Sequence, residues 1–181
     1  MRESTFSPIK AIETLLYITQ RLKKPTIHEV LKIQYFADKL HAQDYGFMPS
    51  GDEYVAMKFG PVGSTTYDII KAARGEITKY SKVFIPLVEN SIEVKKDDSV
   101  IALRESNTDY LSRAQLRFIE EAIEQYGNMP FTERTELSHD EAWTSAWSKA
   151  VARNKLQSPM STKDIINTLP NAQEILEHLS T

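Results

Sequence analysis

Histidine and acidic residues occur at two places where their spacing could support metal binding or acid–base chemistry. Asp38 and His41 are one helical turn apart, and His139, Asp140 and Glu141 are consecutive. If the fold brought the two places together, they could form the active site of a metal-dependent enzyme. The simpler interpretation is a surface His–Asp pair at the first place and a helix cap at the second. Nothing in the sequence joins them, so we predict no metal, no cofactor and no enzymatic activity.

Three further patterns resemble known catalytic or ligand-binding motifs but lack essential residues. The stretch that starts at His28 begins like a zinc-protease motif, but Lys32 stands where a second histidine is required. The glycine-rich turn at 60–65 lacks the Gly-Lys-Ser/Thr ending of a phosphate-binding loop. The run Ser-His-Asp at 138–140 is no catalytic triad, because triad members converge from separate segments.

Composition and charge narrow the class of protein. The chain has 181 residues, no cysteine and a formal net charge of −3. Disulfides, thiolate zinc sites and cysteine nucleophiles are therefore excluded. Basic residues are scattered, and the densest cluster is Arg21, Lys23 and Lys24, so we do not expect nucleic-acid binding. No signal peptide and no membrane-spanning apolar run is visible, and we expect a cytoplasmic protein.

Helix-start signals divide the first half of the chain. Ser7-Pro8 begins one helix, and a second runs from a Thr26–Glu29 capping box to Gly46. Tyr54 to Phe59 is rich in aromatic and apolar residues and predicts a short strand that Gly60-Pro61 ends. We expect Ser64 to cap a third helix, which ends at Gly75.

The second half predicts a β-hairpin followed by helices. Two strands are expected at 92–94 and 100–103, and Ser112 with Gln115 caps the next helix. Ser138 with Glu141 predicts another capping box, which begins a helix that carries Trp143 in the core. Short helices at 162–168 and 172–179 complete the chain. The fold class is mainly α with a small antiparallel β-sheet, as a compact helical domain with a short central strand and a β-hairpin.

Helices followed by a hairpin leave a second hypothesis open, a winged-helix-like DNA-binding regulator. Against this alternative stand the acidic balance of the chain and the run Lys-Lys-Asp-Asp at the expected hairpin tip, 95–98, whose charges cancel.

The stretch from Leu31 to Ile70 resembles the Panacea family, the SocA-like antitoxin domain first described as a phage-associated protein. Downstream, Leu137 to Trp143 resembles the second motif of the family, and the resemblance covers roughly Lys10 to Val151. The matching residues of the first stretch are Lys32, Tyr35, Phe36, Ala37, Asp38, His41, Gly51, Asp52, Tyr54, Val55, Ala56, Lys58, Phe59, Gly60, Pro61, Val62 and Tyr67.

The resemblance implies an antitoxin of a toxin–antitoxin system, which neutralises its cognate toxin by direct protein–protein binding. It also implies an additional role as a proteolytic adaptor, with an ATP-dependent protease as a second partner. We expect a single Panacea-like domain over 1–181, of which 152–181 is a C-terminal helical extension. Only about nine residues precede the first helix, so we expect no N-terminal DNA-binding domain.

Two sets of site residues follow from the resemblance. The toxin-binding candidates flank the central motif, and each could instead be structural, with Asp52 capping a turn and Tyr67 in the core. The candidates are Asp52, Glu53, Lys58 and Tyr67. The residues expected to define the fold are Tyr35, Phe36, Tyr54, Gly60, Pro61, Ser64, Ser138, Glu141 and Trp143.

Overall fold

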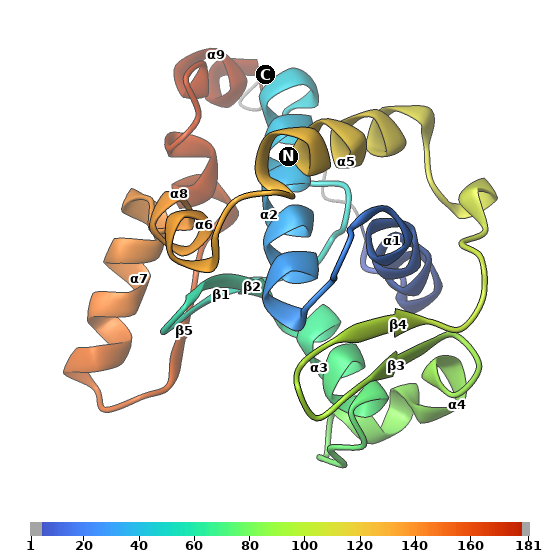
Figure 1. Ribbon diagram of the computed structural model, residues 1–181. Helices are drawn as coiled ribbons and strands as arrows, with labels where there is room; N and C mark the ends of the chain where they lie inside the picture. Colours follow the sequence, from blue (N-terminus) through green and yellow to red (C-terminus); the bar gives the residue numbers. More distant parts are fainter. Residues whose placement is uncertain (1–4, 179–181) are drawn as a thin grey trace.

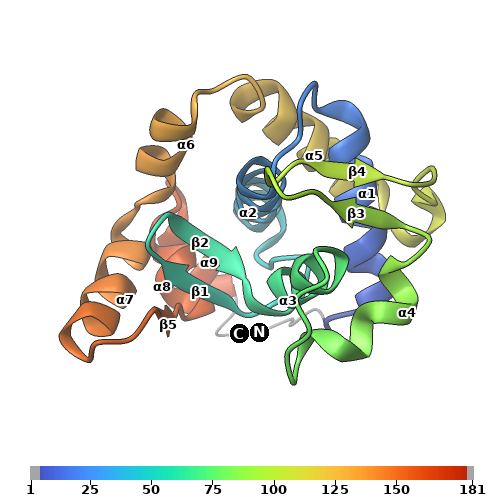
Figure 2. The same cartoon turned by 60° about the horizontal axis from the view of Figure 1, so that its bottom comes forward.

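The computed structural model describes residues 5–178 and is mainly helical, as predicted (Figure 1). Helix α2 (Ile27–Tyr45) lies in the middle, and the other elements surround it (Figure 2). The remaining α-helices are α1 (Pro8–Arg21), α3 (Ser64–Ala73), α4 (Ile85–Val88), α5 (Arg113–Tyr126), α6 (Phe131–Ser138), α7 (Glu141–Ala152), α8 (Thr162–Asn167) and α9 (Ala172–His178). Two short 3-10 helices are η1 (Ser81–Phe84) and η2 (Thr108–Tyr110). Among the described residues, no helix has the length and apolar character needed to cross a bilayer.

Helix α2 is central because its sequence is apolar on more than one face. Its side chains from Val30 to Asp38 are all buried. The predicted capping box is confirmed, since the Thr26 hydroxyl accepts from the Glu29 amide and the Glu29 carboxylate accepts from the Thr26 amide. Gly46 ends the helix in the left-handed region, with φ of 76°.

A three-stranded antiparallel sheet has the strand order β2-β1-β5. The prediction that Gly60-Pro61 ends the central strand is wrong, because these residues begin β2 (Gly60–Gly63), which pairs with β1 (Tyr54–Met57). The pair Met57–Gly60 closes the hairpin, and Lys58-Phe59 form its two-residue turn. Since β2 is an edge strand, Pro61 can lie in it without removing a ladder hydrogen bond.

The third strand, β5 (Gln157–Pro159), comes from the segment expected to be a helical extension. It pairs with β1, with Met57 opposite Gln157 and Val55 opposite Pro159. The segment 152–181 therefore contributes a strand to the sheet as well as the helices α8 and α9. Its treatment as an extension of a single domain stays a prediction, and position 179, the predicted end of the last helix, lies outside the described residues.

Two predicted helix caps are wrong, because tertiary contacts supply other groups. Ser64 is the first residue of α3, and the Asp52 carboxylate accepts from the amides of the next two residues instead. Ser138 ends α6, a helix that was not predicted, so the cap of α7 shifts to Asp140. The Asp140 carboxylate accepts from the Trp143 amide, and Glu141 is the exposed first residue of α7.

The predicted hairpin is confirmed as β3 (Ile92–Val94) and β4 (Val100–Ala102). It lies next to α1 and α3, apart from the three-stranded sheet (Figure 2). Trp143 lies in the core between α7 and the sheet, with 9% of its surface exposed. The core is therefore continuous from α1, across α2, to α7.

Candidate functional site

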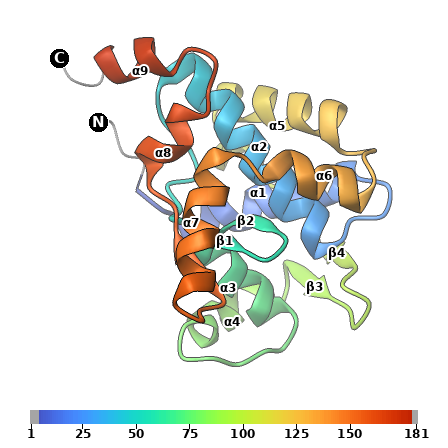
Figure 3. The ribbon, with the colours of Figure 1, turned by 90° about the vertical axis from the view of Figure 1, so that its left-hand side faces the viewer.

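Helices α2 and α6 contact β2 of the β1–β2 hairpin, and α7 contacts β1, beside which it lies in Figure 3. From α2, the Lys32 Nζ donates to the Pro61 carbonyl at 2.7 Å, and Lys32 is only 1% exposed. Burial, with the Arg134 guanidinium nearby, lowers the pKa of Lys32 to about 7. This buried amine fixes β2 to the central helix.

Gly60 is required where the hairpin turn meets α2 and α6. Its φ of +103° lies in a region that side-chain-bearing residues rarely adopt. A Cβ at this position would collide with the Ser138 Oγ and would come within 2.8 Å of the Lys32 Nζ. Because Gly60 has no side chain, Lys32 of the first motif and Ser138 of the second can both lie close to its Cα atom.

From the other side, α7 holds β1 through Trp143. The indole Nε1 donates to the Met57 carbonyl at 2.9 Å, and the ring stacks on His139 with centroids 3.5 Å apart. Asp140, directly before α7, accepts from the Tyr35 hydroxyl and the Lys39 Nζ, both at 2.8 Å. These contacts join α7 to α2 above the sheet.

At the base of the hairpin, two buried carboxylates organise the backbone. Asp38 accepts from the hydroxyls of Ser50 and of Tyr54, the latter at 3.0 Å, and burial raises its pKa to about 6. Asp52 accepts from the Thr65 amide at 3.0 Å and from the Thr66 amide at 2.8 Å. A negative charge at the start of a helix is stabilising, so Asp52 fixes the exit of the hairpin into α3.

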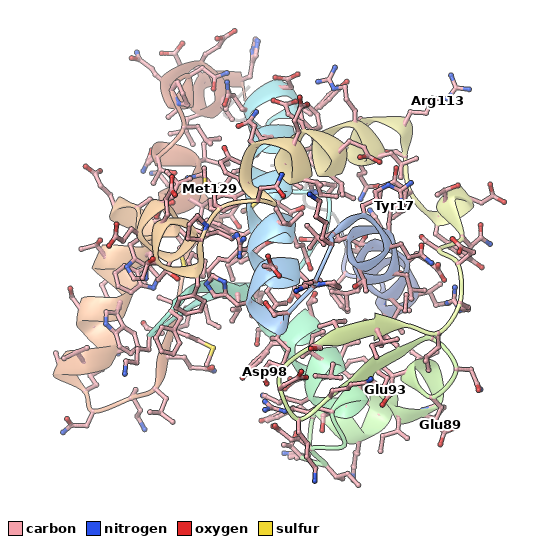
Figure 4. All side chains as sticks on the ribbon, in the orientation of Figure 1. Tyr17, Glu89, Glu93, Asp98, Arg113 and Met129 are labelled. Carbon is pink, nitrogen blue, oxygen red and sulfur yellow. The ribbon has the colours of Figure 1, made fainter. Side chains whose placement is uncertain are left out.

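Sequence analysis did not predict the buried residues between α2 and α6. Arg134 is 2% exposed, pairs with Glu29 at 3.1 Å and donates to the carbonyl of Met129, which Figure 4 labels. The His28 Nε2 lies 3.0 Å from the Thr135 hydroxyl, and burial lowers the pKa of His28 to about 3, with a smaller contribution from Lys32. The polar sequence of α6 gives no local signal that Arg134 is buried.

The turn of the hairpin is exposed, although the strands behind it are held on both sides. Phe59 is 51% exposed and Phe131 of α6 is 49% exposed, and their ring centroids lie 5.6 Å apart. The Lys58 Nζ lies 5.3 Å from the centroid of the Phe59 ring. We call Lys58, Phe59 and Phe131 the tip surface.

The structure separates the four toxin-binding candidates. Lys58 is exposed on the tip surface, whereas Asp52, Glu53 and Tyr67 lie at the base of the hairpin, one strand length away. Asp52 is a buried helix cap, and Glu53 is exposed. Tyr67 is half-buried on α3, with the Lys71 Nζ 4.6 Å from its ring centroid. Whether any of the four contacts a toxin stays a prediction.

The residues expected to define the fold lie mostly in the core. Tyr35 and Tyr54 are 0% and 2% exposed, and Phe36 packs on Tyr126 with ring centroids 4.2 Å apart. There are two exceptions: Ser64 is half-buried and Glu141 is exposed, and neither serves as a helix cap.

The predicted surface pair of Asp38 and His41 is wrong, because both side chains are buried. The His41 Nδ1 lies 3.0 Å from the Phe47 carbonyl, while His139 stacks on an indole elsewhere. In residues 5–178, no three His, Asp or Glu side chains are grouped so that they could hold a metal ion.

The fold and its hairpin define a helical domain whose motif residues position an exposed two-residue turn. The chain belongs to the family described as Antitoxin SocA-like, Panacea domain, whose model matches residues 30–144. The match begins on α2 and ends on α7, so it contains the hairpin and every side chain that holds it. No curated protein and no solved structure is similar enough to the chain to count as a match.

Proposed function

We propose that this protein is an antitoxin that neutralises a cognate toxin by direct protein–protein contact through the tip surface. The observation that carries the proposal is the contact between two exposed rings, Phe131 of α6 and Phe59 on the turn of a hairpin that buried side chains hold on both sides. The family supports the general class of antitoxin-like protein.

Rigid, exposed aromatic residues suit protein recognition. Aromatic side chains dominate many protein–protein interfaces because they bury a large area and lose little conformational entropy. The turn that carries Phe59 is also held before binding by Lys32 and Trp143, so little ordering is required on association.

The edges of the sheet support contact at the tip rather than addition of a partner strand. The Pro61 carbonyl points away from β1 and is already bonded to Lys32, and proline has no amide to offer. On the other edge, the Met160 amide donates to the Tyr54 carbonyl, so the backbone polar groups of Met160 face β1. Because the backbone groups of successive residues in a strand face opposite sides, the nitrogen of Pro159 faces away from β1. Each edge therefore lacks a backbone donor where a new strand would need one.

A role without catalysis is part of the proposal. Lys32, Asp38 and Asp140 all bond to groups that hold the hairpin or a helix. A cavity between α1, α2 and α5 measures about 20 Å³, which suits one water molecule and no substrate.

The proposal extends to delivery of the bound toxin to an ATP-dependent protease, which the family resemblance implies, and places both steps in the cytoplasm. A shorter toxin half-life in cells that express this protein, seen only when the protease is active, would support the adaptor role. An unchanged half-life would limit the protein to neutralisation by binding.

The test of neutralisation is co-expression with the cognate toxin, which we expect to be encoded by the neighbouring gene and call the product of the neighbouring toxin gene. Wild-type protein should restore growth and co-purify with that product, whereas the double variant Phe59→Ser/Phe131→Ser should do neither. The matched control is Tyr80→Ser, an aromatic residue that is 65% exposed on the loop before η1 and should keep full activity.

A thermal melt must show that each variant is folded. If the wild-type protein neither binds nor restores growth, the antitoxin proposal fails. If the folded double variant still neutralises fully, the contact lies away from the tip surface.

A further inference from the structure

The segment 142–163 carries positive charge only. It contains Lys149, Arg153, Lys155 and Lys163 and no acidic residue, in a chain whose net charge is −3. All four side chains are exposed, and none of them forms an ion pair within the described residues. In the linear sequence this cluster is inconspicuous, because its members are four, two and eight residues apart.

Strand β5 brings part of this segment to the tip surface. Gln157 is opposite Met57, the last residue of β1, so Leu156 and Lys58 lie at the same end of the sheet. The chain reaches this point from α7 through a tight turn, visible at the lower left of Figure 1. In that turn the amide of Lys155 donates to the Ala150 carbonyl at 2.9 Å.

Two exposed apolar side chains lie within this basic segment. Leu156 is 85% exposed, the largest exposure among the large hydrophobic residues described, and Val151 near the end of α7 is 56% exposed. Phe59, Leu156 and Val151 are thus exposed apolar residues of the hairpin turn, of the residue before β5 and of the end of α7, and the exposed cations Lys58, Lys149, Arg153 and Lys155 each lie within two residues of one of them in the chain. An apolar centre with a charged rim is the usual anatomy of a protein-binding surface.

We infer that the binding surface extends from the tip surface over Leu156 and that its basic rim selects a partner with an acidic contact surface. This inference rests on the proposed function and adds the chemistry of the partner. Rim charges mainly steer association and suppress wrong partners, so binding should weaken as salt screens them.

A folded acidic protein fits this surface better than a nucleic acid does. Single-stranded nucleic acids are bound by aromatic stacking along a basic groove, whereas the exposed apolar residues within the basic segment itself, Leu156 and Val151, are aliphatic. The positive region is also short, because exposed Glu133 and Glu136 on α6 lie beyond Phe131. A bounded patch suits a discrete acidic patch rather than a continuous phosphate backbone.

The experiment measures the affinity of the purified product of the neighbouring toxin gene at low and high salt. The test variant is Arg153→Glu/Lys155→Glu. The matched control is Lys79→Glu/Lys82→Glu, which reverses two exposed cations around the start of η1 that form no ion pair within residues 5–178. At about 50 mM NaCl the test variant should bind about tenfold more weakly than wild type, and at about 500 mM the difference should shrink. The control should stay within about twofold of wild type at both concentrations.

The outcomes separate this inference from the proposed function. If wild-type protein forms no complex, the proposed function fails and the inference fails with it. If the complex forms but neither salt nor the test variant changes the affinity, only the inference is overturned. It is also overturned if a fluorescent single-stranded oligonucleotide binds wild type and is lost in the test variant while toxin binding is unchanged.

Discussion

The two β-hairpins of this molecule are similar in secondary structure but are held in place by different forces. The β1–β2 hairpin is fixed by side chains that reach its backbone, from Lys32 on one side and Trp143 on the other. Its turn exposes an apolar side chain, Phe59, beside a cation without an ion pair among the described residues, Lys58.

The β3–β4 hairpin is fixed by backbone pairing and apolar burial. The Val100 amide donates to the Pro25 carbonyl at 2.9 Å, and the Ile27 amide donates to the Asp98 carbonyl at 3.0 Å. Its turn, Lys95 to Asp98, has cancelling charges, and Asp98, labelled in Figure 4, pairs with Arg74 at 2.7 Å. Its turn therefore offers a partner little charge and no apolar side chain.

The difference shows which hairpin is specialised for presentation. Backbone pairing tolerates many side chains, whereas the β1–β2 hairpin depends on particular residues at particular positions. A hairpin that had only to be stable would not require such specific side chains. They are expected where the turn must be held in one position before a partner binds.

The largest expected effect comes from removing the indole that holds β1. Trp143→Ala should lower the free energy of unfolding by about 3–5 kcal/mol, because a buried aromatic side chain and its hydrogen bond to the Met57 carbonyl are lost. Hydrogen exchange should show loss of protection in β1 and β2 before β3 and β4. The control Leu103→Ala, which is 47% exposed after β4, should change stability by less than about 0.5 kcal/mol. An unchanged melting temperature in Trp143→Ala would contradict the comparison.

The second effect is a pH dependence of the free energy of unfolding, which we expect to come from Lys32 at the β1–β2 hairpin and not from the β3–β4 hairpin. Lys32 has a folded pKa of about 7, below the value of 10.5 for a free lysine, so between these pH values the unfolded state binds more protons. Stability should therefore rise with pH, by roughly 2 kcal/mol between about pH 7 and about pH 9. Urea unfolding at the two pH values measures this rise.

Two variants isolate the contribution of Lys32. Lys32→Met should abolish the rise, while Lys96→Met, at the exposed turn of the other hairpin, should keep it. Asp38 does not interfere, because its raised pKa of about 6 makes stability fall as pH rises from about 4 to about 6, below this window. A rise that persists in Lys32→Met would assign the pH dependence to another group.

The smallest of the three effects compares two aspartates that bond to backbone amides. Asp52→Ala should cost about 1–2 kcal/mol, because the buried start of α3 loses its cap. Asp97→Ala removes a bond to the Ser99 amide in an exposed turn and should leave the urea midpoint almost unchanged. Equal costs, measured by urea unfolding, would mean that the two hairpins depend on their side chains to the same degree.

Elements whose signals lie within a few residues of one another could be predicted from the sequence. The Thr26–Glu29 and Ser112–Gln115 capping boxes and the β3–β4 hairpin could be predicted because each partner is local. The position of the motif residues in a Panacea-like domain could also be predicted, since their order and spacing are visible in the chain.

Long-range packing is what defines the caps of α3 and α7, the strand β5 and the composition of the tip surface. The Trp143–Met57 hydrogen bond joins residues 86 positions apart and the Tyr35–Asp140 hydrogen bond joins residues 105 positions apart, so no local sequence pattern predicts them. From the sequence alone, an aromatic residue such as Phe59 could belong equally well to the core or to a binding surface. Its exposure follows from where β1 ends relative to α6 and β5, and that is a property of packing.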